Sequence, residues 1–342
     1  MFRFLFICGF AALSLFSKAQ INSPVDSIHF LLDTTIAIMQ KKALNADLVN
    51  WEKLTKELKA ATANVHSVKE AGFAFTRLYD ELKDAHGAFY YKDTAFRSTG
   101  KIKNVDKINE VTYEELKKGP KLVAMMLNNG IAYVRIPFVS VQDSAGVLKF
   151  ANRLNDSVTS LLKRNPKGLI IDLRLNQGGN MYPMIAGLRS LYKEGNISES
   201  YTYEFKDKNI SPVIFRNDSL ICEYYKIKIS NYKDYSRTRV AVLIGPSTAS
   251  AGECTAASLT YRSPSVLIGE ESMGLTNGND GFMLSGNNIG FNLAVGVLKD
   301  GKGKRLDEVI QPNIPVAGGD NFTELEKDLK IIRAVEWIVK KK

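Results

Sequence analysis

The stretch that decides the fold is Val240-Ala-Val-Leu-Ile-Gly-Pro-Ser-Thr-Ala-Ser250-Ala-Gly-Glu253. An apolar run bounded by a Gly-Pro turn predicts a buried strand that leads into a helix beginning near Ser250. The N-terminus of such a helix offers free backbone N–H groups and a partial positive charge, which suit a developing oxyanion. Taken alone, the last four residues also fit a capping box, in which the serine only caps the helix. Ser247 is a second serine in the same turn.

On both sides of this stretch, short apolar runs alternate with helical stretches, a pattern typical of an α/β domain. The runs expected to form strands are 122–127, 131–136, 168–173, 240–244, 266–268 and 291–297. The expected helices are 147–163, 251–261 and 322–339. We therefore predict an α/β core over residues 121–342.

The first part of the chain has a different pattern. Residues 22–86 carry apolar side chains at helical spacing, so an N-terminal helical domain is expected over 20–92. The polar, lysine-rich segment 93–120 is expected to be a connector. At the very start, a basic residue, an apolar run too short to span a bilayer and the ending Ser17-Lys18-Ala19 predict a signal peptide over 1–19. We therefore expect a periplasmic or extracellular protein.

The composition limits the classes of binding partner that are expected for this chain. The chain is 45% hydrophobic and 24% charged, with a formal net charge of +10. Because its lysines are scattered and no recognition motif occurs, a solvated basic surface is favoured over a nucleic-acid partner. No later segment is apolar enough for a membrane span. Cys222 and Cys254 lack metal-ligand spacing; two unpaired thiols are expected, and a disulfide stays open because sequence cannot place them in space.

Two further motifs carry polar groups. In Gly168-Leu-Ile-Ile-Asp172-Leu-Arg174-Leu-Asn176-Gln-Gly178-Gly179, a strand ends in a polar turn with paired glycines, where bare backbone can approach a ligand. A tight turn held by its own polar side chains fits this motif equally well. The second motif, Leu82-Lys-Asp84-Ala-His86-Gly87, ends the helical region. His29 and His66 lie in helical patterns, whereas His86 lies where a helix gives way to a loop, a better place for a working side chain.

Taken in order, these motifs resemble the tail-specific (C-terminal processing) serine proteases. Asp-Leu-Arg-x-Asn-x-Gly-Gly at 172–179, Ser-x-Ala-Ser-Ala-Gly-Glu at 247–253 and Val-Leu-Ile-Gly-Glu at 266–270 are similar to the core of that family. Leu82-x-Asp84-x-His86 is similar to the branch that contains the tricorn core. Residues 310–316 are similar to the closing segment, with Asn313 in place of the usual Asp. The resemblance implies a crotonase-like ββα core and an endopeptidase that acts on polypeptides without a metal or organic cofactor.

The resemblance also assigns roles. It implies that Ser250 is the nucleophile and that the N–H groups of Ala251 and of Gly178 or Gly179 form the oxyanion hole. The best-known members use a Ser–Lys dyad, but Leu275 stands at the lysine position and cannot take a proton.

The Ser/His branch of the family therefore implies His86 as the general base. An acid then orients the histidine; Glu308 matches the branch, and Asp307 and Glu270 are rivals. The segment between His86 and Lys121 is too short for the peptide-binding PDZ module of many relatives. The retinoid-binding relatives of the vertebrate eye carry hydrophobic ligands on this fold, so a non-catalytic carrier of hydrophobic ligands or peptides is the alternative.

Overall fold

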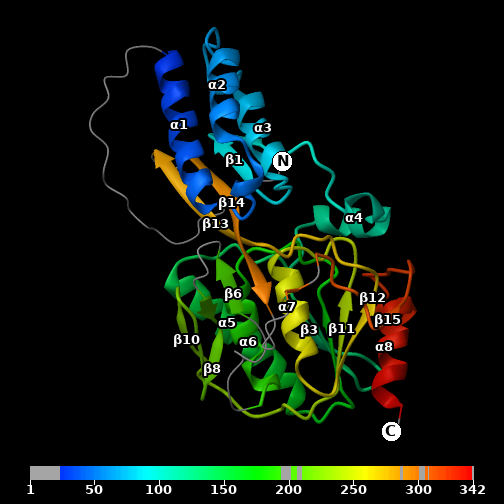
Figure 1. The fold of residues 1–342 in the computed structure, drawn as a ribbon. Coiled ribbons are helices and arrows are strands. Elements are labelled where there is room, and N and C mark those ends of the chain that lie inside the picture. The colour runs from blue at the N-terminus through cyan, green and yellow to red at the C-terminus, as the bar shows by residue number, and fades with distance from the viewer. Residues whose placement is uncertain are drawn as a thin grey trace. The chain divides into compact units, whose positions relative to one another are not determined.

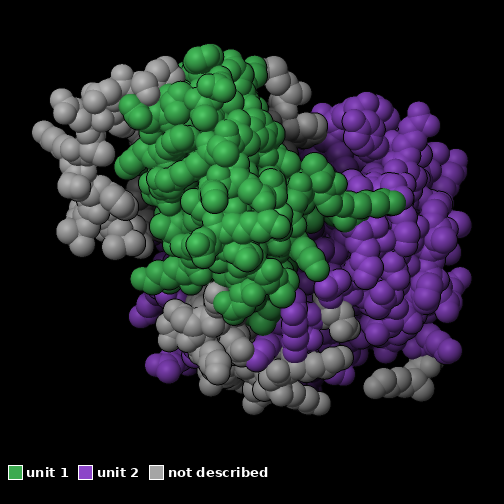
Figure 2. All heavy atoms as spheres, turned by 45° about the horizontal axis from the view of Figure 1, so that its top comes forward, with its two compact units in different colours: residues 1–102, 203–210, 277–297 green, residues 103–202, 211–276, 298–342 purple. Residues whose placement is uncertain are grey.

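The computed structural model describes residues 24–193, 202–205, 210–285, 288–299, 305–306 and 308–340. The signal peptide expected over 1–19 lies outside these residues. The chain forms two compact units, coloured separately in Figure 2. Unit 1 comprises residues 1–102, 203–210 and 277–297, and unit 2 comprises 103–202, 211–276 and 298–342. No helix within the described ranges has the length and apolar character of a membrane span.

Unit 1 packs helices against a mainly antiparallel sheet (Figure 1). Its helices are α1 (Pro24–Lys42), η1 (Ala46–Leu48), α2 (Trp51–Ala61) and α3 (Gly72–Leu82). Its strands are β1 (Ala88–Tyr91), β2 (Thr94–Phe96), β6 (Thr202–Phe205), β7 (Ile210–Pro212), β13 (Gly278–Ser285) and β14 (Ile289–Lys299). The strand order is β2-β1-β14-β6-β7, and β13 also pairs with β14. Strands from distant parts of the sequence therefore complete the unit that the N-terminal helices begin.

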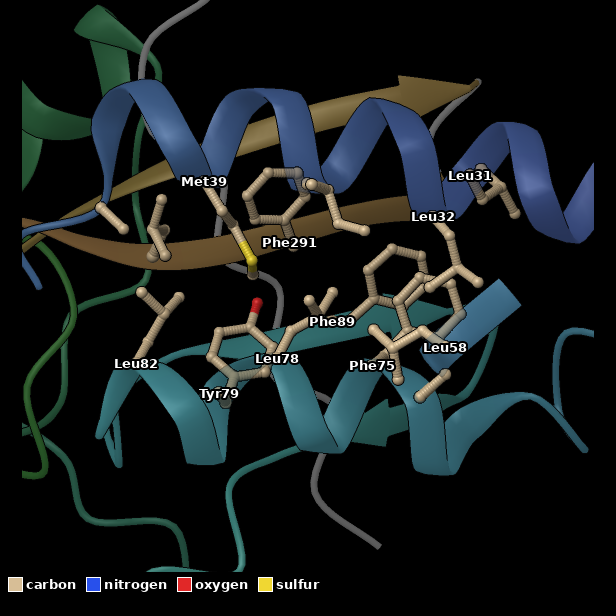
Figure 3. Close-up of a cluster of buried hydrophobic side chains, with 14 of the residues drawn as sticks. Leu31, Leu32, Met39, Leu58, Phe75, Leu78, Tyr79, Leu82, Phe89 and Phe291 are labelled. Atoms are coloured by element: carbon tan, nitrogen blue, oxygen red, sulfur yellow. The ribbon is translucent and has the colours of Figure 1, made fainter. Parts of the chain in front are cut away.

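The core of unit 1 is apolar and aromatic (Figure 3). Leu32 and Met39 point from α1 toward α3, which carries Phe75, and all three side chains are fully buried. Phe75 stacks on Phe89 of β1 with ring centroids 3.7 Å apart. Phe89 in turn lies opposite Phe291 in the register of β1 and β14. This stack ties the helices to the sheet, because large aromatic rings bury more apolar surface than other side chains.

Unit 2 is built on a six-stranded sheet of order β15-β12-β11-β5-β4-β3, in which only β3 runs antiparallel to its neighbour. Its strands are β3 (Val123–Met126), β4 (Ala132–Arg135), β5 (Leu169–Asp172), β11 (Val240–Ile244), β12 (Ser265–Gly269) and β15 (Ile314–Pro315). A small antiparallel sheet holds β8 (Ile214–Arg216), β9 (Ser219–Ile221) and β10 (Lys226–Lys228).

The helices of unit 2 are η2 (Val105–Lys107), α4 (Glu110–Lys117), α5 (Ser144–Leu162), α6 (Met181–Gly187), η3 (Arg189–Leu191), α7 (Ala251–Thr260), η5 (Leu325–Lys327) and α8 (Leu329–Val339). Of these, α5, α7 and α8 contact strands of the large sheet. From α8, the apolar side chains of Ile331, Ala334 and Ile338 pack on the strands. The segment expected to be a connector thus contains β2, η2 and α4. The predicted α/β class with a helical N-terminal region is confirmed.

Candidate active site

The polar motifs of unit 2 meet at one edge of its large sheet. β5 and β11 are parallel neighbours, with Asp172 opposite Leu243, so the segments that follow both strands emerge at the same edge. One segment carries Asn176 and the paired glycines, and the other leads to Ser250. The Ala249 N–H donates to the Asn176 carbonyl at 3.0 Å and joins the two segments.

Ser250 lies between β11 and α7 in a strained backbone conformation. Its φ is +52° and its ψ is −120°, a sparsely populated region that costs on the order of 1–3 kcal/mol for a residue with a side chain. Ser250 is half-buried, and its N–H donates to the Glu253 carboxylate at 2.8 Å. The capping box indicated by the sequence is present. A capping role alone does not require the strain, and strain of this kind is concentrated at functional sites.

The paired glycines lie beside Ser250 with positive φ angles, +111° for Gly178 and +99° for Gly179. A Cβ on Gly178 would lie 2.8 Å from the Ser250 Cβ, and one on Gly179 would lie 2.1 Å from the Val139 carbonyl oxygen. Both positions therefore require glycine. The Gly178 N–H donates to the Asn176 side-chain oxygen at 2.9 Å. No hydrogen bond between described residues engages the Gly179 N–H, so Gly179 keeps the free donor.

A second backbone donor comes from Ala251. It is the first residue of α7, and the first N–H groups of a helix have no partner within the helix. The rival Ser247 is only 1% exposed, and its hydroxyl donates to the Arg174 carbonyl. Ser250, which is half-buried, is therefore the more accessible serine of this turn.

Glu253 was predicted only as a capping partner, and the structure gives it more contacts. It is fully buried. One carboxylate oxygen accepts the N–H groups of Ser250 at 2.8 Å and Leu275 at 2.9 Å. The other accepts the Ser272 hydroxyl and the Gly274 N–H, the latter at 2.9 Å. Burial raises the pKa of Glu253 to about 7, although these hydrogen bonds oppose the rise.

A buried ion network holds the end of β5 to α8. The Arg174 guanidinium donates to Asp172 at 2.7 and 3.0 Å, to Asp320 at 2.6 Å and to Asp328 at 2.7 Å. Burial opposes ionisation of Asp172, but the charge of Arg174 outweighs it and lowers the pKa of that carboxyl to about 2. Lys330, which is also fully buried, donates to Asp320 at 3.0 Å. The polar turn predicted at 172–179 is thus held by partners far away in the sequence.

The described part of the chain contains two of the three acids considered as the orienting acid. Glu270 joins the ion network, with a carboxylate oxygen 2.8 Å from the Lys330 ammonium. The Glu308 side chain is 74% exposed, and the Lys103 ammonium lies 4.0 Å away. Glu270 is therefore committed to an ion pair, and Glu308 is the freer of the two. Asp307 lies outside the described residues.

His86 belongs to unit 1 and follows α3. Lys83 ends that helix in a left-handed conformation, and the Asp84 carboxylate then accepts the N–H groups of His86 at 3.0 Å and Gly87 at 2.8 Å. The Nδ1 atom of His86 is buried and has no hydrogen-bond partner among the described residues. Burial, aided by the charge of Arg97, lowers the pKa of His86 to about 4. The ring is therefore neutral at pH 7 and can accept a proton.

Within unit 2, the structure brings together Ser250, Gly178, Gly179 and Ala251. His86 lies in the other unit, and the structure defines each unit by itself, so its pairing with Ser250 stays a prediction. The same holds for the pairing of His86 with Glu308.

The cysteines and the possible metal ligands of the described residues can be assessed in the same way. Among the described residues, no group of three or more His, Cys, Asp or Glu side chains is arranged to hold a metal ion. Cys222 and Cys254 are both free. Burial raises the pKa of Cys222 to about 11 and also raises that of Cys254, so neither is a thiolate at neutral pH.

Comparison with known proteins identifies the family. The model of peptidase family S41 matches residues 130–316, which is more than half of the chain and includes the turn at Ser250. The chain therefore belongs to peptidase family S41, as the resemblance to tail-specific proteases implied.

Two relatives share part of the sequence, and a solved structure shares the fold. A nisin-resistance protein of Lactococcus lactis subsp. lactis is 36% identical over 121 residues, covering 35% of this chain and 37% of that protein. The carboxy-terminal processing protease CtpA of Bacillus subtilis (strain 168) is 36% identical over 125 residues, covering 36% and 23%. The matches thus span less than two thirds of either relative. The structure of a lipoprotein from Streptococcus agalactiae has the same fold, with a TM-score of 0.69 and 20% identity over 95% of this chain and 99% of that one.

Proposed function

We propose that this chain is an exported serine endopeptidase that cleaves polypeptides through an acyl-enzyme on Ser250. The observation that carries the proposal is the half-buried, strained Ser250 at the start of α7, with Gly178 against its side chain. In a member of peptidase family S41, this arrangement supports a nucleophile rather than a simple helix cap.

The proposed reaction uses His86 as general base. The Ser250 hydroxyl oxygen attacks the substrate carbonyl carbon while its proton passes to the unprotonated ring nitrogen of His86. The oxyanion that forms accepts hydrogen bonds from the N–H groups of Ala251 and Gly179, with Gly178 shaping the turn. When the carbon–nitrogen bond of the substrate breaks, His86 gives this proton to the leaving amine. Water then hydrolyses the acyl-enzyme. Glu308 is proposed to accept a hydrogen bond from the imidazole and to hold its tautomer.

The substrate is proposed to be a polypeptide. The names of the two relatives refer to nisin resistance and to carboxy-terminal processing, so nisin and an unfolded protein with a free C-terminus are the two substrates to compare. We expect cleavage of at least one of them. Periplasmic or extracellular location follows from the signal peptide predicted over 1–19, and N-terminal sequencing of the exported protein should begin at Gln20.

A fluorophosphonate probe tests the proposal, because such probes label activated serine nucleophiles covalently. The purified chain should be labelled, and Ser250→Ala should abolish labelling. Ser247→Ala is the matched control, since this serine is buried in the same turn; it should still be labelled. Labelling that survives Ser250→Ala and is lost in Ser247→Ala would mean that Ser247, and not Ser250, is the nucleophile. A folded chain that is never labelled, yet binds fatty acids tightly, would favour the carrier alternative.

A further inference from the structure

The Glu253 carboxylate joins segments that are far apart in the sequence. Of its four hydrogen-bond donors, only the Ser250 N–H belongs to the helix start that a cap would satisfy. The other three come from the loop 272–275, through the Ser272 hydroxyl and the N–H groups of Gly274 and Leu275. Helix capping requires only the contact with the Ser250 N–H, so it does not explain the three contacts with the loop.

The loop 272–275 in turn contacts the segment that carries Glu308. The Ile310 N–H donates to the Ser272 hydroxyl oxygen at 2.7 Å. A Cβ on Gly274 would lie 3.4 Å from the Glu308 carbonyl oxygen, an ordinary packing distance. A continuous chain of hydrogen bonds thus runs from the Ser250 N–H through Glu253 and Ser272 to the Ile310 N–H.

We propose that Glu253 is a positioning residue that holds the nucleophile Ser250 and the segment of the proposed acid Glu308 in fixed register. This inference rests on the proposed function and deepens it. Each Glu253 oxygen already accepts two hydrogen bonds, and the group that Ser250 offers it is the N–H. Glu253 therefore acts through the main chain of Ser250 and takes no proton from its hydroxyl.

The substitution that tests this role is Glu253→Gln, which keeps the shape of the side chain and replaces one acceptor oxygen by an NH₂ group. The Ser272 hydroxyl can turn to accept from that group, so the chain should fold, but one main-chain N–H of the loop loses its acceptor. We expect the rate of fluorophosphonate labelling to fall on the order of 10²-fold, as for a reacting group displaced by about 1 Å. KM for a peptide substrate should stay within about threefold, because only the reacting geometry changes.

Asn155→Ala is the matched control. Asn155 is equally buried, and its side chain accepts from the Ser190 hydroxyl and donates to the Asn231 carbonyl, away from the Arg174 network, so its loss should lower the melting temperature without the labelling defect. Ser272→Ala, which breaks the link to Ile310 but leaves the cap, should give a smaller defect of the same kind.

Hydrogen exchange supplies a readout that is independent of activity. In Glu253→Gln, the amides of Gly274 and Leu275 should exchange faster, while those of β12 and the middle of α7 stay protected. Equal labelling rates in Glu253→Gln and the wild type, or a defect matched by Asn155→Ala, would overturn the proposal. If the wild type is not labelled at all, the proposed function fails, and exchange still decides whether Glu253 couples the two segments.

Discussion

The two units support their proposed catalytic side chains by different physical means. In unit 2, Ser250 is surrounded by buried polar groups: Glu253 holds its main chain, and Arg174 holds the neighbouring turn through three carboxylates. In unit 1, His86 follows a helix whose core is apolar and includes the stack of Phe75 on Phe89. Each unit is well packed. In unit 1, the buried Asp84 carboxylate joins the main chain at His86 to Ala294 of β14, whereas in unit 2 two buried polar networks hold the functional turn.

The difference shows what each kind of support can do. Apolar packing contributes most of the stability but tolerates small adjustments of shape. A fully satisfied buried polar network is directional, since each donor and acceptor must keep its partner or incur the cost of desolvation. The nucleophile is therefore pre-organised within its own unit. For His86, the Asp84 carboxylate orders the main chain, while the ring nitrogen Nδ1 has no partner among the described residues.

The largest expected effect is a loss of turnover, and it should distinguish His86 from His66, the two histidines of unit 1 that follow α2. His86→Ala should lower turnover by about 10³-fold or more, because a serine hydroxyl without its base is a weak nucleophile. The melting temperature should change little, which differential scanning calorimetry can check. His66→Ala is the control, since His66 is exposed, and it should keep full activity. If His86→Ala retains more than about a tenth of the wild-type rate, another group serves as the base.

The next effect breaks the polar support of unit 2. Arg174→Met should destabilise the chain by about 3–5 kcal/mol, because it leaves Asp172 and Asp328 buried without their cation, while Asp320 keeps Lys330. Chemical denaturation would measure this loss. Labelling by the fluorophosphonate probe should also slow in the molecules that remain folded, since the network holds the turn beside Ser250.

The matched variant in unit 1 is Phe75→Ala. Removing this fully buried ring should cost a similar 3–5 kcal/mol, roughly the range for large-to-small core changes. Its labelling rate per folded molecule should equal that of the wild type. An equal activity defect in both variants would mean that polar and apolar support are equivalent here and would break the comparison.

Local patterns predicted most elements of unit 2. The runs 168–173 and 240–244 form β5 (Leu169–Asp172) and β11 (Val240–Ile244), and the helix expected over 251–261 is α7 (Ala251–Thr260). These signals are strong because a fully buried parallel strand is a continuous apolar run followed at once by turn residues. The same local patterns predicted that Ser250 and the paired glycines follow the ends of two strands, which are neighbours in the sheet.

The features that local patterns did not predict depend on contacts between residues that are distant in the sequence. The helix expected over 322–339 begins only at Leu329, because the Asp328 carboxylate caps it there and also binds Arg174. Strand β1 follows the N-terminal helices and pairs with β14, whose residues lie about 200 positions later. The contacts of Glu253 with the loop 272–275 are equally non-local, so a capping pattern was all that the sequence could indicate.

The smallest expected effect concerns the proton affinity of the base. Since burial and Arg97 lower the pKa of His86 to about 4, the labelling rate should rise with pH as the ring loses its proton near pH 4, below the ordinary value of about 6.5. Burial raises the pKa of Glu253 to about 7, so its titration can add a second limb, at higher pH, to the plot of labelling rate against pH. Arg97→Ala distinguishes the two, because removing this positive charge favours the protonated imidazole and moves only the lower limb, toward higher pH.

Lys92→Ala is the control for Arg97→Ala, since Lys92 is another cation of unit 1, with its ammonium over the Tyr91 ring, whereas Arg97 is the cation that lowers the pKa of His86. Its pH profile should match the wild type. The same pKa shift predicts a stability effect of definite sign. Between about pH 4 and 6.5 the unfolded chain binds a proton at His86 that the folded chain does not, so the free energy of unfolding should increase as pH rises through that window. That contribution to the slope should vanish in His86→Ala; a slope that is unchanged would mean that His86 has the same pKa in the folded and the unfolded chain.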